Sequence, residues 1–211
     1  MLPGTWNLEP GTWNGSMRRR PASAIRVFAG LWKRRHLEVP EGSRPTSGRA
    51  REALFSILQK RIPDARVLDL YAGSGAVGIE AVSRGAARAV LVEKDARVLR
   101  KNLARLPPAG GEISVLEEDA GQALVRLAAG GVRFDLVFAD PPYETTEGGS
   151  RAAVADVLAP EGIFVLRGDR FGAPPSLPGL FLLDRREYGR NVFFFYGRHT
   201  TARVSGRSGS L

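Results

Sequence analysis

The chain has 211 residues, 43% of them hydrophobic, which suits one α/β domain with a full core and short appendages. It has no cysteine, which excludes disulfides, thiolate zinc sites and enzymes that attack a pyrimidine ring with a cysteine. No stretch reaches the ~18 apolar residues of a membrane span, and residues 1–24 lack the apolar segment of a signal peptide. Two distant histidines without an acidic cluster predict no metal site. We therefore expect a cytoplasmic protein.

Positive charge is concentrated near the N-terminus. Residues 1–60 hold 11 Lys and Arg against 4 Asp and Glu, a net of +7, whereas residues 61–211 hold 20 against 18, a net of +2. This distribution is typical of an arm that binds a polyanion. Residues 1–24 contain Pro-Gly-Thr-Trp-Asn twice without periodicity, so we expect a disordered extension, with Met17 as an alternative start.

The first predicted elements form a basic hairpin. Two short β-type runs, 25–28 and 32–39, surround Gly30. Their alternating side chains are basic or aromatic: Arg26, Trp32, Lys33, Arg35 and His36. Such a hairpin is either a solvated edge whose charges prevent aggregation or a platform that contacts phosphates and bases. The concentration of charge favours the platform.

A helix is predicted next, from about Arg49 to Lys60, with Ser47 as its cap. Arg49 and Arg51 lie in its first turn, where cations oppose the helix dipole. Because that placement costs stability, we expect a negatively charged ligand nearby.

Strands and helices then alternate. Predicted strands cover 66–71, 89–93, 113–116, 134–139 and 162–167. The stretch 72–78 is predicted to open a helix that runs through about residue 84, and further helices are predicted at 95–106, 121–129 and 150–159. A terminal antiparallel pair, 181–186 and 191–196, surrounds Gly189, and residues 199–211 are predicted to be a disordered tail. The alternation predicts an α/β fold with a doubly wound, mainly parallel Rossmann-like sheet. We expect residues 25–60 to form a basic extension and 61–198 the main domain.

The loop after the first core strand fits a nucleotide-binding pattern. Residues 73–78 read G-x-G-x-x-G, and Glu93 follows Gly73 by 20 residues, as in dinucleotide-binding proteins. Asp69, on the strand before this loop, would repel a pyrophosphate. The same carboxylate would stabilise the sulfonium and ammonium groups of S-adenosylmethionine, which carries no phosphate. The sequence therefore predicts S-adenosylmethionine as the cofactor.

Acidic residues follow the ends of successive predicted strands. Glu93 can accept both ribose hydroxyls, and Asp119 can accept from the adenine amino group. For any one of these carboxylates, a helix cap or a solvated loop is the simpler interpretation, but their regular placement favours a binding row. The predicted cofactor-binding residues are Asp69, Ala72, Gly73, Ser74, Gly75, Glu93, Lys94, Asp119 and Ala120.

The stretch 134–143 carries the predicted chemistry. Its apolar run predicts a buried strand, which ends at Asp140, Pro141, Pro142 and Tyr143. Neither proline can donate to a sheet, so a carboxylate, a rigid turn and an aromatic ring lie just beyond the carboxyl end of a strand. Open α/β sheets bind their ligands at that edge. This tetrapeptide resembles the catalytic motif of amino-group methyltransferases that act on nucleic-acid bases, and the resemblance implies that these four residues are the catalytic group.

From residue 25 to about 196, the chain resembles the bacterial methyltransferases that modify a guanine N2 of 16S ribosomal RNA. The stretches that carry the resemblance are 26–30, Arg-Pro-Thr at 44–46, Arg-Glu-Ala-Leu-Phe at 51–55, 69–78, 92–94 and Asp-Pro-Pro-Tyr at 140–143. The chain departs from the family pattern at Gly48, where an Asp is usual, and at Arg167, where an acidic residue is common.

The resemblance implies a class I methyltransferase sheet and a target base flipped out of its stack. Asp140 and the Pro141 carbonyl would accept the two N–H groups of the amine, and Tyr143 would stack on the base. The residues implied to bind RNA are Arg26, Lys33, Arg34, Arg35, Arg44, Thr46, Arg49 and Arg51. The implied partner is 16S rRNA, within a 30S subunit or an assembly intermediate, and the expected state is a monomer.

Other functions remain open from the residues. An adenine-N6 DNA methyltransferase would use the same tetrapeptide, but we find no additional target-recognition domain. The basic arm disfavours a protein-glutamine methyltransferase, and the intact Asp140 motif disfavours a non-catalytic RNA-binding or assembly factor. A dehydrogenase would leave both Asp69 and the Asp140 motif unexplained.

Overall fold

The computed structural model describes residues 24–42, 47–141, 153–168, 170 and 172–199. Most of the predicted N-terminal extension and nearly all of the predicted tail lie outside these ranges. Within the described residues, no helix combines the length and apolar character that crossing a membrane requires.

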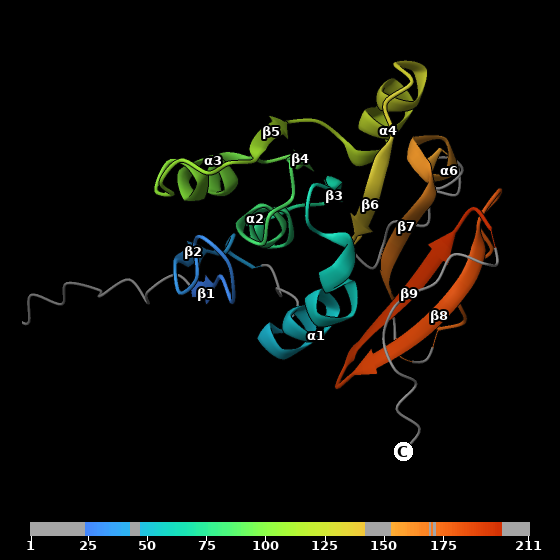
Figure 1. The fold of residues 1–211 in the computed structure, drawn as a ribbon, viewed down its shortest axis with the longest axis horizontal. Coiled ribbons are helices and arrows are strands. Elements are labelled where there is room, and N and C mark those ends of the chain that lie inside the picture. The colour runs from blue at the N-terminus through green and yellow to red at the C-terminus, as the bar shows by residue number, and fades with distance from the viewer. Residues whose placement is uncertain (1–23, 43–46, 142–152, 169, 171, 200–211) are drawn as a thin grey trace, which may run out of the picture.

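A seven-stranded sheet forms the centre of the molecule, with the strand order β5-β4-β3-β6-β7-β9-β8 (Figure 1). Neighbouring strands from β5 to β7 are parallel, while β9 runs antiparallel to both β7 and β8. The strands are β3 (Arg66–Leu70), β4 (Arg88–Val92), β5 (Glu112–Leu116), β6 (Phe134–Ala139), β7 (Leu158–Gly168), β8 (Phe181–Tyr188) and β9 (Asn191–Gly197). This confirms the predicted doubly wound sheet with antiparallel C-terminal strands.

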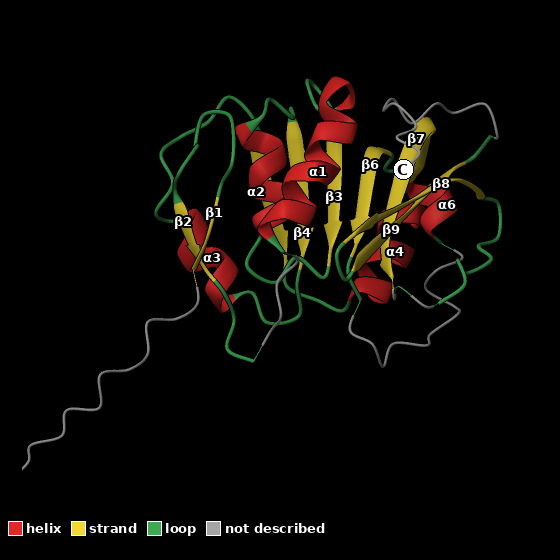
Figure 2. Cartoon of the chain, turned by 90° about the horizontal axis from the view of Figure 1, so that it is seen from below, coloured by secondary structure: helices red, strands yellow, loops and turns green. Residues whose placement is uncertain are grey.

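Helices cover both faces of this sheet. They are α1 (Gly48–Leu58) followed by the 3₁₀ turn η1 (Gln59–Arg61), α2 (Ala76–Ser83), α3 (Arg97–Leu103), α4 (Ala120–Ala129) and α6 (Val154–Val157). Helices α1, α2 and α3 lie on one face, and α4 and α6 on the other (Figures 1 and 2). Alternate residues of β6 serve the two cores: Leu136 and Phe138 pack on the α1–α3 side, and Val137 and Ala139 on the α4–α6 side. Burial on both faces explains the continuous apolar run of this strand.

The start of β7 differs from the prediction. The predicted helix 150–159 is described from residue 153 onwards and ends at Val157, and β7 begins at Leu158 rather than at residue 162. Leu158 is already paired with Phe134 at the start of β6. Pairing with a neighbouring strand therefore overrides the local helical pattern in this segment.

Residues 24–42, which we call the N-terminal arm, contain the predicted hairpin. Strands β1 (Ala24–Arg26) and β2 (His36–Glu38) pair antiparallel, and Gly30 has a φ of 79° in the connection between them. The arm packs on α2 through Glu80, whose buried carboxylate accepts the N–H groups of Phe28 at 2.8 Å and Ala29 at 3.0 Å. The arm and the sheet domain therefore share one core.

Three further hydrogen bonds hold the arm, two of them to side chains of α2 and α3. The Ser83 hydroxyl accepts from Trp32 N at 2.9 Å, and Trp32 Nε1 donates to the Pro107 carbonyl at 3.0 Å. The Asn102 Oδ1 atom accepts from Glu38 N at 2.8 Å. Trp32 is only 4% exposed, so it belongs to the core and not to the basic platform in which the sequence analysis placed it.

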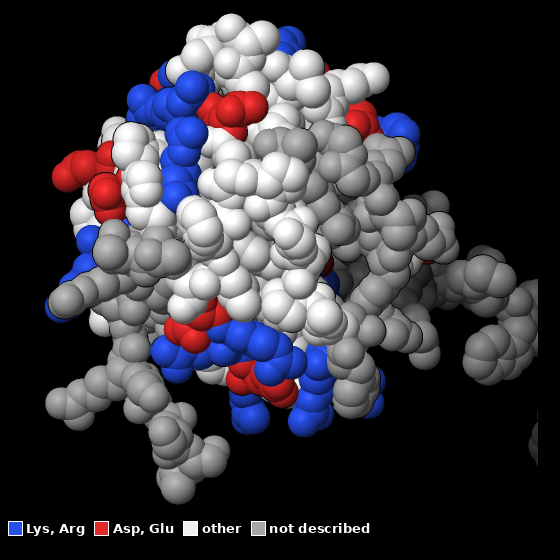
Figure 3. Space-filling model, turned by 90° about the vertical axis from the view of Figure 1, so that its right-hand side faces the viewer, with Lys and Arg blue, Asp and Glu red and all other residues white. Residues whose placement is uncertain are grey.

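The β8 edge of the sheet is lined by charges of both signs. Arg186 pairs with Asp184 at 2.8 Å, and Arg170 pairs with Glu187 at 3.3 Å. Figure 3 looks onto the molecule from this side, and basic and acidic side chains lie next to one another near the rims of a largely uncharged middle. Alternating charges on an edge strand disfavour pairing with other chains.

Candidate active site

The carboxyl ends of the parallel strands meet at one edge of the sheet, towards the bottom of Figure 2. Asp69 is the penultimate residue of β3, Glu93 follows β4, and Asp140 follows β6. The charges of Asp140 and Glu93 both raise the pKa of Asp69. The structure thus brings these three carboxylates together, whereas Asp119 has a different local role.

Asp69 is the most deeply buried carboxylate of this row. Asp69 is only 4% exposed, and its Oδ2 atom accepts the Gly78 N–H at 2.9 Å. The pKa of Asp69 is raised from 3.8 to about 7, with burial as the largest cause; the Gly78 N–H acts in the opposite direction, and the charges of Asp140 and Glu93 add to the rise. A cationic ligand at this edge would favour the ionised form.

The raised pKa of Asp69 makes the stability of the free protein depend on pH. Below pH 3.8, the pKa of Asp69 in the unfolded chain, both the folded and the unfolded protein hold the proton. Between pH 3.8 and about 7, only the folded protein holds it. The free energy of unfolding should therefore fall as the pH rises through this window. Asp69→Asn retains an acceptor for the Gly78 N–H and cannot titrate. Urea unfolding from pH 4.5 to 8 should show a smaller fall for the variant, and equal slopes would contradict the assignment.

The three glycines of the G-x-G-x-x-G stretch at the start of α2 have different structural roles. Gly75 caps α2 with a φ of 80°, and a Cβ on it would lie 2.4 Å from a Leu99 methyl group. A Cβ on Gly78 would lie 2.7 Å from a Leu91 methyl group. Only Gly73 has open space around its Cβ position, with the Tyr71 carbonyl 4.0 Å away. Gly75 and Gly78 therefore serve the turn and helix packing, and Gly73 leaves room for a ligand.

Glu93 is bonded to the glycine loop in this structure. Its Oε2 atom accepts the Gly73 N–H at 2.7 Å, and its Oε1 atom accepts the Asp95 N–H at 3.2 Å. A carboxylate has about four lone-pair sites, so Glu93 can still accept further hydrogen bonds. The Ser74 carbonyl accepts from Asn102 Nδ2 at 2.9 Å, which fixes the loop on α3.

The remaining predicted cofactor residues have clear local positions. Asp119 is the N-cap of α4 and accepts the N–H groups of Gly121 at 2.8 Å and Gln122 at 3.4 Å. This is the simpler of its two interpretations, and it leaves Oδ2 without a role in the cap. Ala120 is buried at the start of α4, and Lys94 is exposed.

Asp140 is paired with a residue whose contact the sequence analysis missed. Arg167 Nη1 donates to Oδ1 of Asp140 at 2.7 Å and to Oδ2 at 2.8 Å. The sequence showed that Arg167 departs from the family pattern, but it did not show that Arg167 pairs with Asp140 at the end of the neighbouring strand. Pro141 follows Asp140 within the described residues, whereas Pro142 and Tyr143 lie outside them.

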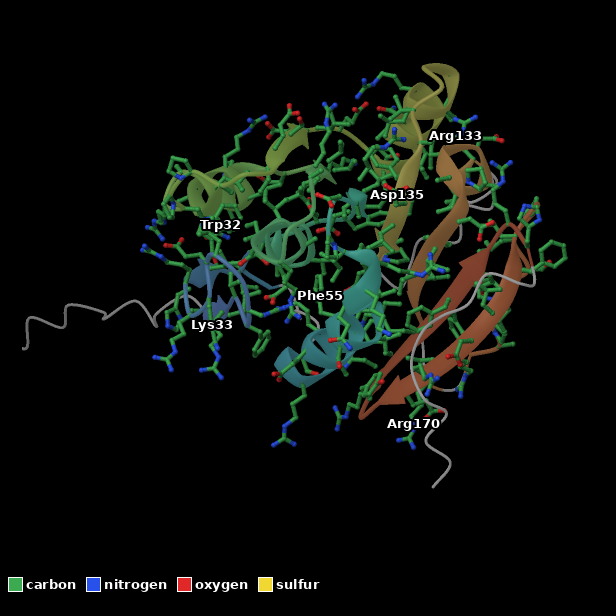
Figure 4. The ribbon with its side chains drawn as sticks, in the orientation of Figure 1. Trp32, Lys33, Phe55, Arg133, Asp135 and Arg170 are labelled. Atoms are coloured by element: carbon green, nitrogen blue, oxygen red, sulfur yellow. The ribbon has the colours of Figure 1, made fainter. Side chains whose placement is uncertain are left out.

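The basic residues of the predicted RNA surface separate into two groups. Arg26, Lys33, Arg34, Arg35 and Arg49 are exposed, and Figure 4 shows Lys33 pointing away from the body while Trp32 lies on the α3 side. Arg44 and Thr46 lie outside the described residues.

Arg51 is the exception among the described basic residues. It is 2% exposed, lies 4.9 Å from the centre of the Phe28 ring, and donates through Nη2 to the Arg26 carbonyl at 2.6 Å. Burial lowers the pKa of Arg51, and the charge of Glu80 raises it. Because its guanidinium serves the core, we leave Arg51 out of the proposed RNA surface.

Glu80 is a second residue that the sequence analysis missed. It is 0% exposed and anchors the N-terminal arm. A signal was present, since Glu80 is the only charged residue in α2 and the rest of that helix is apolar or small. A lone charge in such a helix indicates a buried partner.

Comparisons with known proteins agree with this arrangement. The family model described as Conserved hypothetical protein 95 matches residues 25–197. Ribosomal RNA small subunit methyltransferase D of Escherichia coli (strain K12) is 37% identical over 184 residues, which are 81% of this chain and 87% of the relative. The namesake from Haemophilus influenzae (strain ATCC 51907 / DSM 11121 / KW20 / Rd) is 39% identical over 124 residues, which are 56% of this chain and 64% of the relative.

Solved structures extend the likeness to three dimensions. The methyltransferase yhhF from Escherichia coli superposes with a TM-score of 0.73 at 35% identity, and the match covers 85% of this chain and 100% of that one. The family model, which matches residues 25–197, covers the arm from residue 25, the glycine loop and the Asp140 strand end together. The chain therefore belongs to the ribosomal RNA small subunit methyltransferase D family.

Proposed function

We propose that this protein transfers a methyl group from S-adenosylmethionine to the exocyclic N2 amine of a guanine in small-subunit ribosomal RNA. Family membership supports a methyltransferase that uses S-adenosylmethionine and acts on ribosomal RNA. The observation that carries the guanine N2 assignment is the position of Asp140, directly after β6 and next to the carboxylates of Asp69 and Glu93. The proposed partner is 16S rRNA, in a 30S subunit or an assembly intermediate, and the proposed state is a monomer.

The carboxylates and the open space at Gly73 fit S-adenosylmethionine as the cofactor. The carboxylates of Asp69 and Glu93 suit a cationic ligand that has hydroxyl groups, and the open position at Gly73 lets such a ligand approach the backbone closely. Asp69 would neutralise positive charge, and Glu93 would accept ribose hydroxyls beside its bond to Gly73. S-adenosylmethionine, when bound, supplies an electrophilic methyl group on a sulfonium.

Asp140 would prepare the substrate amine. The N2 amine of guanine is a poor nucleophile because its lone pair is delocalised into the ring. Hydrogen bonds from the amine to the Asp140 carboxylate and the Pro141 carbonyl would orient it and draw the lone pair out of conjugation. The carboxylate would also stabilise the positive charge that develops on the nitrogen, so catalysis rests on positioning and electrostatics. Tyr143, outside the described residues, is proposed to stack on the flipped base.

Transfer of a labelled methyl group tests the proposal. Undermethylated 30S subunits, protein-free 16S rRNA and duplex DNA are compared side by side with the full chain and labelled S-adenosylmethionine. We expect label in the ribosomal samples, mapping to guanine N2, and the ratio of particle to naked RNA reports how far ribosomal proteins present the base. Label only in DNA, as N6-methyladenine, would reject the substrate while retaining the role of Asp140. No label with cofactor bound would reject the activity.

The exposed cations of the N-terminal arm are the proposed phosphate contacts. Lys33→Ala should weaken RNA binding uniformly across RNA sequences. It should also make the plot of log affinity against log salt concentration less steep, by the amount expected for the loss of about one phosphate contact. Arg133→Ala is the matched control, because it removes the same charge at the amino end of β6, far from the arm in Figure 4. Equal effects of the two substitutions, measured by fluorescence anisotropy over a salt series, would reject the arm as the contact surface.

A further inference from the structure

Arg167 lies on β7, the strand adjacent to β6, and closes one side of the Asp140 carboxylate. In the sheet register, Leu166 pairs with Ala139, so the residues that follow each of them, Arg167 and Asp140, are neighbours at the same edge. The side chains are 19% and 36% exposed, respectively. Arg167 is therefore a partly buried cation beside the group that is proposed to hold the substrate amine.

The Arg167 guanidinium donates to Asp140 through one nitrogen only. Nη1 donates to both carboxylate oxygens, at 2.7 Å and 2.8 Å. The Nε atom is buried and has no hydrogen-bond acceptor among the described residues. The edge of a guanidinium formed by Nε and Nη2 is a side-on fork for planar acceptors, and on Arg167 this edge is not the one that Asp140 uses. A buried donor without an acceptor is destabilising and uncommon in native proteins.

We propose that Arg167 is a specificity-determining residue that donates to the O6 acceptor of the target guanine through a nitrogen that Asp140 does not use. This inference rests on the proposed function, because it assigns the substrate amine to Asp140. O6 and the 2-amino group lie on the same base-pairing edge of guanine, so one guanidinium can donate both to the carboxylate that holds the amine and to O6. Adenine presents an amino donor where guanine has O6, and that donor would face the N–H groups of Arg167. Asp140 and Arg167 together would thus select a purine that has an amine on one side and a carbonyl on the other.

The alternative role for Arg167 is that of a counter-ion alone. In that case it would hold the plane of Asp140 and contact no base. Loss of Arg167 would then slow transfer to every base that carries a 2-amino group by the same factor. Only a residue that contacts the base changes the ratio between two such bases, so the ratio separates the two roles.

The test uses synthetic RNA in which the methylated guanine, once mapped, is either retained or replaced by 2,6-diaminopurine. Both bases carry the 2-amino group, and the replacement exchanges O6 for an amino donor. The full-length wild-type protein should prefer guanine in kcat/KM by on the order of 10- to 100-fold. Arg167→Met should bring this ratio close to one, and Arg167→Lys, which keeps the charge but not the fork, should give an intermediate ratio.

Arg186→Met is the matched control, because Arg186 is also partly buried and paired with a carboxylate but lies on β8. It should leave the ratio unchanged. A ratio preserved in Arg167→Met, or a wild-type protein that does not discriminate, would overturn the inference. Binding of S-adenosylhomocysteine by calorimetry checks the fold of each variant, and if Arg167→Met fails to fold, Arg167→Lys decides. A wild-type protein inactive on guanine RNA would instead reject the proposed function, and this inference with it.

Discussion

Replacement of Asp140 by alanine should lower kcat for methyl transfer by on the order of 10³-fold, the loss typical of removing a preorganised electrostatic contact in an active site. The carboxylate lies directly after β6 and is proposed to orient the amine and stabilise its developing charge. Its two oxygens accept from Arg167 Nη1, and the cofactor is proposed to be held by Asp69 and Glu93 instead. Cofactor affinity should therefore change little, and single-turnover transfer together with calorimetry of S-adenosylhomocysteine binding measures the two effects separately.

A neutral variant of the same shape refines this prediction. Asp140→Asn retains an acceptor oxygen and loses the charge, so it should keep more activity than the alanine variant. Asp135→Ala is the matched control, since Asp135 is on the same strand but near its opposite end, where it accepts from Arg66 N at 2.8 Å (Figure 4). An Asp140→Ala protein that turns over at the wild-type rate would reject the proposed catalytic group.

Glu80→Ala should cause the largest loss of stability, about 3–5 kcal/mol, as expected when one partner of a buried ionic network is removed. The carboxylate is 0% exposed, accepts two backbone N–H groups of the arm, and pairs with Arg84 at 2.7 Å. Its charge also favours the charged form of buried Arg51. In a chain of this size the corresponding fall in Tm is roughly 10 °C, which thermal unfolding followed by circular dichroism can measure.

The stability prediction has a clear control. Glu112 pairs with Arg88 at 3.7 Å on the surface, with side chains 64% and 51% exposed. Glu112→Ala should change the free energy of unfolding by less than about 0.5 kcal/mol. Hydrogen exchange should show faster opening of residues 24–42 in Glu80→Ala. A loss below about 1 kcal/mol, or unchanged protection of the arm, would contradict the anchoring role of Glu80.

Local patterns predicted most of the fold. The run 134–139 was predicted to the residue because every position but Asp135 is apolar and both ends are marked by charge or proline. Ser47 was predicted to cap α1, and its hydroxyl accepts from Ala50 N at 3.3 Å. These features depend on neighbours in the sequence, so one chain contains the information. The start of β7 could not be predicted in the same way, because it depends on β6.

The contacts that were missed join residues far apart in the chain. Arg167 meets Asp140 across two strands, and Glu80 meets the arm more than 50 residues before it. Neither partner choice is encoded in hydrophobic periodicity. Arg51 illustrates the same limit, because a cation in the first turn of a helix suggested an anionic ligand, whereas the aromatic face of Phe28 lies over it. A single sequence can show that a charged residue stands in an unusual position, but it does not show which distant residue contacts it.

Asn102 has a consequence for anyone who wishes to build chimaeras from related proteins. Its side-chain amide donates to the Glu38 carbonyl and the Ser74 carbonyl, both at 2.9 Å, and so ties the arm to the glycine loop through one residue. An arm exchanged as a cassette would meet foreign partners at this amide. A graft that keeps the recipient functional must therefore carry the receiving side chains of α2 and α3 along with the arm.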